Sequence, residues 1–166
     1  MQSRGHMRAN AIVAGLLVLC VSTVLFAEGP EDSTSPEKER CPVCKMFVSM
    51  FEEWNSRIEF KDRAATVFDG SKCMFKYYLN MQKYDSSRKR SDVSSISVRD
   101  YYSKTYVDAR QAFFVIWSDI YGPMGHEPIP FEREVDAKSF LKEHKGKRIL
   151  RFQDINTRVI TALDNP

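Results

Sequence analysis

Hydrophobic residues in the first half of the chain occur in short runs and then at helical spacing. Aromatic and β-branched residues bounded by charges favour short strands, whereas apolar positions that recur every three to four residues favour an amphipathic helix. This pattern predicts strands at 47–51, 58–60 and 66–68, a turn at Asp69-Gly70 and a helix to about Met81. Asp69 or Ser71 is available to cap the first backbone amides of that helix.

The second half shows a similar pattern. Residues 96–101 alternate between apolar and polar, and the continuous apolar run 112–117 suits a central strand. A helical stripe of apolar residues then begins near Asp136 and ends just before Gly146, a residue type that commonly follows a helix. Residues 148–152 return to a strand pattern.

Each half therefore offers paired strands followed by a helix, and in the second half a strand follows the helix. We expect an α+β fold in which two similar strand-strand-helix-strand (ββαβ) units, at about 41–84 and 96–160, pack as one compact domain at 41–166. The polar stretch 85–95 separates the units, because it carries charges and serines without hydrophobic periodicity. A chain of 166 residues is long enough for one ordinary domain.

The first 27 residues have the pattern of an export signal. Arg4, His6 and Arg8 precede an uncharged apolar run at 11–26, which predicts a signal peptide or an N-terminal anchor at 1–27. Residues 28–40 carry charges, Pro and Ser without a large apolar residue, which predicts a disordered spacer. The domain is therefore expected in the periplasm or at the outer face of the cell envelope, with a membrane tether at its N-terminus if the leader is retained.

The charge balance of the domain gives no reason to expect a nucleic-acid partner. The whole chain has 25 Lys and Arg against 22 Asp and Glu. Removal of the leader removes Arg4 and Arg8 but no acid, which leaves 23 basic against 22 acidic residues and a net charge of +1. Proteins that bind nucleic acid rely on many more basic than acidic side chains.

The motif Cys41-Pro-Val-Cys44-Lys-Met46 places two thiols and a thioether within six residues. Such soft sulfur donors select copper(I) over hard cations. Cysteine pairs at this spacing also occur in thioredoxin-like oxidoreductases and in zinc sites, and a disulfide between Cys41 and Cys44 is a further alternative in an oxidising compartment. Cys73 falls on the predicted first helix, where an isolated cysteine is usually a buried apolar residue.

The zinc and redox alternatives are each weakened by sequence context. A structural zinc site has four ligands, and the sequence has no second Cys-x-x-Cys or His-x-x-x-His pair. A thioredoxin-like pair lies after a strand at the start of a helix, whereas this pair follows a polar spacer. A thiol-disulfide oxidoreductase that uses Cys41 and Cys44 stays the main alternative to copper binding.

A second motif, Tyr-Gly-Pro-Met124-Gly-His126, places a thioether in a glycine-flanked turn and an imidazole two residues later. Such a turn can direct Met124 toward a partner site. Glu127 is expected at the surface. The sequence has no Ser-His-Asp arrangement, no glycine-rich phosphate loop and no paired His-Glu motif, so it does not indicate an enzyme.

Several motifs in order along 41–155 together resemble the NosL family. They are Cys-x-x-Cys-x-Met-x-Val from Cys41, Trp54, Phe68-Asp69, Val98-Arg-Asp-Tyr101, Gly122-Pro-Met-Gly125 and the helix Asp136-Ala-x-x-Phe140. Lys45 lies where glycine is common in that family.

The resemblance implies an extracytoplasmic copper(I) chaperone built from two ββαβ units that helps to assemble the copper centres of nitrous oxide reductase. It implies that the metal is held by Cys44, Met46 and Met124, with Cys41 and His126 as supporting ligands. The partners would be the copper ion and a copper-receiving enzyme or accessory protein of the nitrous oxide reductase system. Copper(I) would be bound as cargo.

Overall fold

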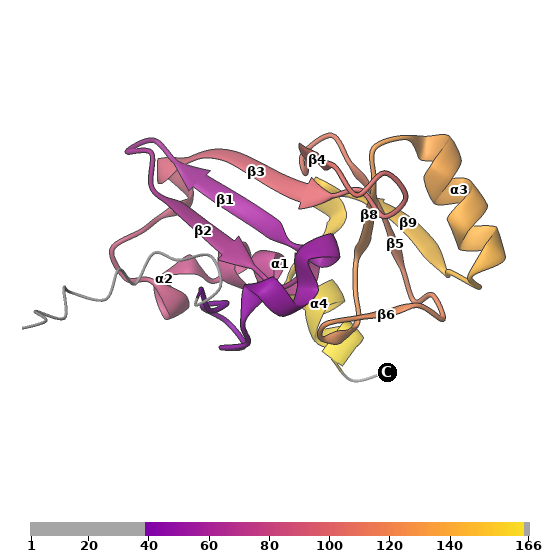
Figure 1. Ribbon diagram of the computed structural model, residues 1–166, viewed down its shortest axis with the longest axis horizontal. Coiled ribbons are helices and arrows are strands. Elements are labelled where there is room, and N and C mark those ends of the chain that lie inside the picture. Colours follow the sequence, from indigo (N-terminus) through magenta and orange to yellow (C-terminus); the bar gives the residue numbers. More distant parts are fainter. Residues whose placement is uncertain (1–38, 165–166) are drawn as a thin grey trace, which may run out of the picture. The chain divides into compact units, whose positions relative to one another are not determined.

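Alternation of buried and exposed residues builds the first and largest antiparallel sheet among the described residues. Along β1 (Ser56–Phe60) the residues at 56, 58 and 60 are buried while Arg57 faces solvent, which is the period of a strand with one face on a core. The strand order is β2-β1-β3-β4. The other three strands, drawn in Figure 1, are β2 (Ala65–Phe68), β3 (Val93–Arg99) and β4 (Tyr106–Asp108).

The computed structural model describes residues 39–164, all of which belong to one unit of the chain. The leader predicted at 1–27, and the spacer predicted at 28–40 apart from its last two residues, lie outside the described residues. Those two residues take part in the fold, because the Glu39 carbonyl accepts a hydrogen bond from the Val48 amide and Arg40 forms a β-bridge with Phe47. Within 39–164, no helix has both the length and the apolar character needed to cross a membrane.

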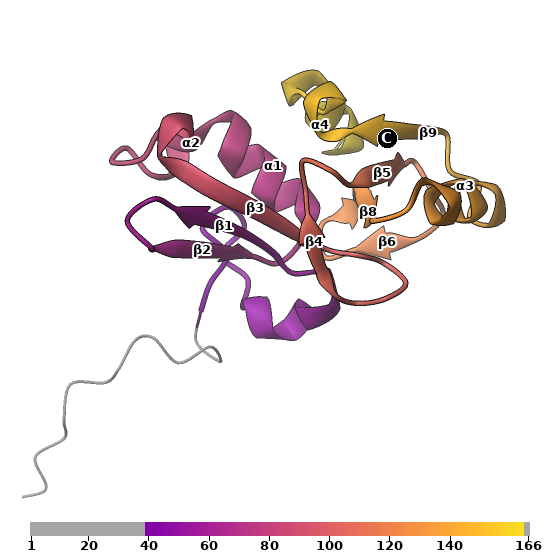
Figure 2. The ribbon, with the colours of Figure 1, turned by 90° about the horizontal axis from the view of Figure 1, so that it is seen from above.

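Helix α1 (Ser71–Leu79) packs against β1 and β2, and Figure 2 shows it along one face of this sheet. Cys73, Met74 and Phe75 are fully buried there, and because consecutive helical residues face different directions, the N-terminal half of α1 is enclosed on more than one side. The short helix α2 (Met81–Tyr84) and the 3-10 helix η3 (Arg90–Asp92) lead from α1 to β3.

The second sheet has the strand order β8-β5-β9, formed by β8 (Ile129–Phe131), β5 (Phe113–Ile116) and β9 (Arg148–Arg151). Helix α3 (Glu134–Glu143) packs on all three strands. A small hairpin of β6 (Tyr121–Gly122) and β7 (Gly125–His126) is inserted between β5 and β8. After β9, the 3-10 helix η4 (Phe152–Asp154) leads to α4 (Thr157–Asp164), which packs on α1 and β7.

The α+β fold and the ββαβ repeat predicted from the sequence are confirmed. In each sheet, the first strand of the unit lies in the middle, with the second strand on one side and the strand after the helix on the other. The predicted assignment of strands to the units needs one correction, because the strand predicted at 96–101 is β3 and pairs with β1 in the first sheet. The partner of the strand predicted at 112–117 is instead β8, which the sequence pattern does not reveal. Pro130 lies within β8, and proline is tolerated there because β8 is an edge strand.

The strand predicted at 47–51 is wrong, since this segment forms the 3-10 helix η2 (Val48–Trp54). Val48 is buried but Met50 is 66% exposed, so the segment does not present an alternating face to the core. Asn55 ends the helix, and its backbone amide donates to the Glu52 carbonyl.

Aromatic rings join the two units in one core. The ring of Phe75 on α1 lies 5.2 Å from that of Phe114 on β5 and 5.1 Å from that of Phe152 after β9. These contacts fix α1 against both sheets, so the position of the residues at its N-terminus is set by the whole domain.

Candidate metal centre

The cysteine motif forms a closed loop between Arg40 and Phe47, which pair as a β-bridge. Within the loop, the Cys41 amide donates to the Met46 carbonyl at 2.9 Å, and the Lys45 amide donates to the Cys41 carbonyl at 2.9 Å. Lys45 adopts a left-handed backbone with φ of 69°. Glycine takes this conformation without steric strain, and in this chain the Lys45 ammonium compensates in part by donating to the Pro42 carbonyl at 2.9 Å.

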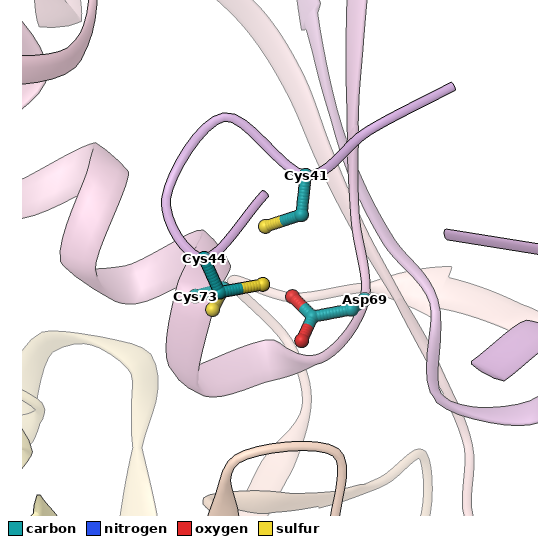
Figure 3. A group of neighbouring side chains, drawn as sticks. All are labelled: Cys41, Cys44, Asp69 and Cys73. Carbon is teal, nitrogen blue, oxygen red and sulfur yellow. The ribbon is translucent and has the colours of Figure 1, made fainter. Parts of the chain in front are cut away.

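The N-terminus of α1 supplies the other side of the site. Asp69 follows β2 directly, Gly70 leads into α1, and Cys73 lies in the first turn of the helix. The loop between Arg40 and Phe47, called the Cys-loop below, folds over this helix start, as Figure 3 shows. The Sγ atoms of Cys41, Cys44 and Cys73 and a carboxylate oxygen of Asp69 all lie within 4.8 Å of one another.

Burial distinguishes the four donors. Cys41, Asp69 and Cys73 are completely buried, whereas Cys44 is partly exposed and gives the cluster its contact with solvent. No amide, hydroxyl or ammonium group donates to either carboxylate oxygen of Asp69, so the three thiols, which are weak donors, are its only polar partners. Buried carboxylates are almost always bound by stronger donors than thiols, so a carboxylate that lies among three sulfur atoms is an unusual feature of the site.

The thiols differ in acidity. The pKa of Cys41 is lowered to about 7, chiefly because the Cys73 side chain donates a hydrogen bond to its sulfur, although burial opposes the change. Burial raises the pKa of Cys44 to about 12. The hydrogen bond to Cys41 and burial both raise the pKa of Cys73 far above its ordinary value. In the absence of metal, Cys41 is therefore the thiol that loses its proton most readily, while Cys73 stays protonated.

The structure places the predicted site residues in two groups. Cys41 and Cys44 lie in the cluster together with Cys73. Met46 is partly buried in the Cys-loop, and Met124 is partly buried in the turn between β6 and β7, where it packs against the core that contains Cys41 and Cys73. His126 does not contribute to the cluster of donor atoms.

His126 is held instead by aromatic side chains. Its ring lies 5.0 Å from that of Trp117 and 4.7 Å from that of Tyr121, measured between centroids. Its Nδ1 atom is buried and has no hydrogen-bond partner. This packing fixes the orientation of the β6–β7 hairpin that carries Met124.

Glu127, expected at the surface, is buried with 1% of its area exposed, so this prediction is wrong. One carboxylate oxygen accepts hydrogen bonds from the Lys72 amide at 2.7 Å and from the Ser71 hydroxyl at 3.2 Å. The other accepts one from the Met124 amide at 3.3 Å. Glu127, rather than the predicted Asp69 or Ser71, therefore satisfies the first turn of α1, where a negative charge is stabilised by the helix dipole.

The Lys72 ammonium completes this connection between α1 and the hairpin. It is 1% exposed, donates to the Met124 carbonyl and pairs with Asp164 at 3.3 Å. Burial nevertheless raises the pKa of Glu127 to about 7, and the hydrogen bond from the Lys72 amide and the charge of its ammonium limit the rise. The Met124 turn is thus anchored to the helix residue that precedes Cys73.

Asp69 is the donor that the sequence pattern misses, and Cys73 is the one that it interprets as an ordinary core residue. An aspartate followed by glycine at the end of a strand has the local signature of a turn or helix cap, which conceals any second role. The spacing Asp69-x-x-x-Cys73 is the only local signal, because it puts both side chains at the start of one helix.

Comparisons with known proteins agree with this fold and motif order. A family model described as NosL matches residues 33–160. The crystal structure of the copper chaperone NosL from Shewanella denitrificans superposes with a TM-score of 0.60 at 22% sequence identity, over 78% of this chain and 99% of that chain. At this identity the likeness shows a shared fold. No curated protein sequence matches the chain.

Proposed function

This chain belongs to the NosL family, and we propose that it is an extracytoplasmic metallochaperone that binds copper(I) and delivers it to a copper enzyme. The observation that carries the proposal is the convergence of three thiols, from Cys41, Cys44 and Cys73, within 4.8 Å. Copper(I) has a filled d shell and favours two or three sulfur ligands, so this donor set matches its preference. The structural relative is named as a copper chaperone, which supports the same proposed function.

The differing burial of the thiols suits transfer by ligand exchange. Cys41 and Cys73 are enclosed by the core, whereas Cys44 is partly exposed. A thiolate of the receiving protein can therefore approach the metal only beside Cys44, displace that ligand and draw the ion outward. No bond of a substrate is broken, and each thiolate that leaves the metal takes up a proton again.

The thioethers of Met46 and Met124 are proposed as further ligands during this exchange. Met46 belongs to the same loop as Cys44, and Met124 is held beside α1 by Lys72 and Glu127. A neutral thioether binds copper(I) without proton release, so it can replace a thiolate while the ion moves. His126 is proposed as a support for the hairpin, because its ring packs between those of Trp117 and Tyr121.

Competition titration tests the copper assignment. The purified, reduced protein is titrated anaerobically with copper(I) against a chromogenic chelator, and wild type is compared with Cys44→Ala and Met124→Ala. We expect Cys44→Ala to lower the affinity by at least tenfold and Met124→Ala to lower it less. Met50→Ala is the matched control, because Met50 is 66% exposed and lies outside the cluster. Unchanged affinity in both site variants would refute the assignment.

A thiol-disulfide oxidoreductase is the alternative that the same cysteine pair allows. Such an enzyme attacks with an accessible thiol of low pKa. Here the pKa of the partly exposed Cys44 is raised to about 12, and the thiol with the low pKa, Cys41, is buried. The arrangement is therefore the reverse of what the enzyme needs. Reduction of a model protein disulfide by the purified protein at a catalytic rate would favour the enzyme instead.

The proposal also covers the cellular location of the protein and the identity of the protein that receives its copper, called the client below. The leader pattern at 1–27 supports work in the periplasm or at the outer face of the envelope, and family membership supports nitrous oxide reductase or one of its accessory proteins as the receiver. Cell fractionation tests the location. Mixing the copper-loaded protein with metal-free nitrous oxide reductase, with separation of the two and metal analysis of each, tests the client; copper that stays with the chaperone would contradict it.

A further inference from the structure

We propose that Asp69 gives the thiol cluster a second metal specificity: with Cys41, Cys44 and Cys73 it forms a four-donor site for a divalent thiophilic cation of the zinc class. The inference shares its thiols with the proposed copper function, but its defining ligand is the carboxylate. Asp69 would thus be the specificity-determining residue of the site.

The surroundings of Asp69 point to a cation. The side chain is completely buried, and no amide, hydroxyl or ammonium group donates to either of its oxygens, which lie among the three thiols. The residue does not cap α1, because Gly70 is the N-cap and the Lys72 amide is bound by Glu127. None of the ion pairs among residues 39–164 includes it. A buried carboxylate whose only donors are weak thiol groups gains more from coordination of a metal than from those hydrogen bonds.

The geometry of the four donors fits a tetrahedral ion. Zinc bound to sulfur at about 2.3 Å and to a carboxylate oxygen at about 2.0–2.2 Å separates neighbouring ligand atoms by roughly 3.5–3.8 Å. The four donor atoms lie within 4.8 Å of one another. Closure of the site therefore needs shifts of roughly 1 Å at most, which side-chain rotations in the Cys-loop can supply.

The carboxylate discriminates between the two metals. Copper(I) is soft and is satisfied by two or three sulfur ligands, so it gains little from a carboxylate oxygen. Zinc is of borderline softness, accepts sulfur together with oxygen, and forms its closed sites with four ligands. A fourth anionic donor also attracts a dication more strongly than a monocation. Removal of the Asp69 charge should thus weaken zinc binding and leave copper(I) binding nearly intact.

Asp69→Asn tests the inference in the purified, reduced protein under anaerobic conditions. Cobalt(II) serves as the coloured probe for zinc, and zinc affinity is measured by displacement of the cobalt. Wild type should show the visible bands of tetrahedral cobalt and sulfur-to-cobalt charge transfer. Asp69→Asn should bind zinc at least tenfold more weakly while its copper(I) affinity changes by less than about threefold. Asp62→Asn, in the exposed β1–β2 turn, is the matched control and should change neither.

Two outcomes overturn the inference: wild type without tetrahedral cobalt bands, or equal zinc affinity in wild type and Asp69→Asn. If Asp69→Asn does not fold, X-ray absorption of zinc-loaded wild type decides the question, since three sulfur atoms and one oxygen are expected around the metal and a shell without oxygen refutes the role of Asp69. The copper proposal fails separately, because a protein that binds zinc through Asp69 but does not bind copper(I) refutes the chaperone function and upholds this inference.

Discussion

Replacement of Glu127 by glutamine should remove a large part of the dependence of stability on pH. Glu127 is fully buried, and burial raises the pKa of its carboxyl group from 4.5 to about 7. Glutamine has nearly the same shape and keeps an oxygen that can accept the hydrogen bond from the Lys72 amide. The substitution therefore removes the titration while it preserves most of the packing.

The direction and size of the effect follow from the two pKa values. Between pH 4.5 and 7 the folded protein holds a proton on Glu127 that the unfolded chain has lost, so this group makes the free energy of unfolding fall as pH rises. Its contribution is fully present below pH 4.5 and is lost once pH passes about 7. A pKa difference of this size corresponds to about 3 kcal/mol. The stability of Glu127→Gln relative to wild type should therefore rise by about 3 kcal/mol between pH 4.5 and pH 8.

Urea unfolding of the reduced, metal-free protein, followed by circular dichroism from pH 4.5 to 8, measures this difference. Other titrating groups act equally in both proteins, so they cancel when the two curves are subtracted. Glu132→Gln is the control, because Glu132 is exposed, and its curve should run parallel to that of wild type. A Glu127→Gln curve that is also parallel to wild type would refute the reasoning.

Three further predictions concern the same region. Lys72→Met should cost about 3–5 kcal/mol in urea unfolding, because it removes a buried ammonium and leaves its partners, the Met124 carbonyl and Asp164, without it. Lys76→Met loses only an outer pair with Asp164 and should cost less than about 1 kcal/mol. Gly122→Ala should destabilise the protein by about 1–3 kcal/mol, since the added Cβ would lie 2.5 Å from Glu127 Cγ, and a matching loss in thermal unfolding checks it. Copper(I) affinity should rise with pH between 6 and 8, because the Cys44 thiol, with a pKa of about 12, must lose its proton to bind, and the rise should be steeper below pH 7, where Cys41 is protonated too. Competition titrations across this pH range measure the slope, and a flat profile would contradict thiolate binding at these residues.

Hydrophobic periodicity was sufficient to predict the α+β repeat because its strands and helices bury regular faces. The strand at 56–60 and the helix at 134–143 show this regularity, whereas the strand at 113–116 is recognised by its continuous apolar run. Periodicity could not predict which strands pair, since hydrogen bonding between β1 and β3 depends on the path of the chain through α1. It also failed at β8, where three consecutive buried residues include a proline.

The candidate site was predictable only where its residues are neighbours in sequence. Cys41 and Cys44 are separated by only two residues of a single loop, and their chemistry is visible from this spacing. Asp69 is brought to them by the fold alone. Glu127 also could not be predicted as buried, because the groups that satisfy it, at Ser71 and Lys72, lie more than fifty residues away.

The anchoring of the Met124 hairpin gives the two sequence motifs a physical connection. Lys72 and Glu127 bind the hairpin to the first turn of α1, and Cys73 lies in that same turn. A displacement of α1 when a metal draws Cys73 and the Cys-loop together would therefore be transmitted directly to the backbone of Met124. Because the connection consists of largely buried hydrogen bonds, it can hold only one arrangement well. The thioether and the thiols should consequently respond to metal as one unit, although they come from opposite halves of the chain.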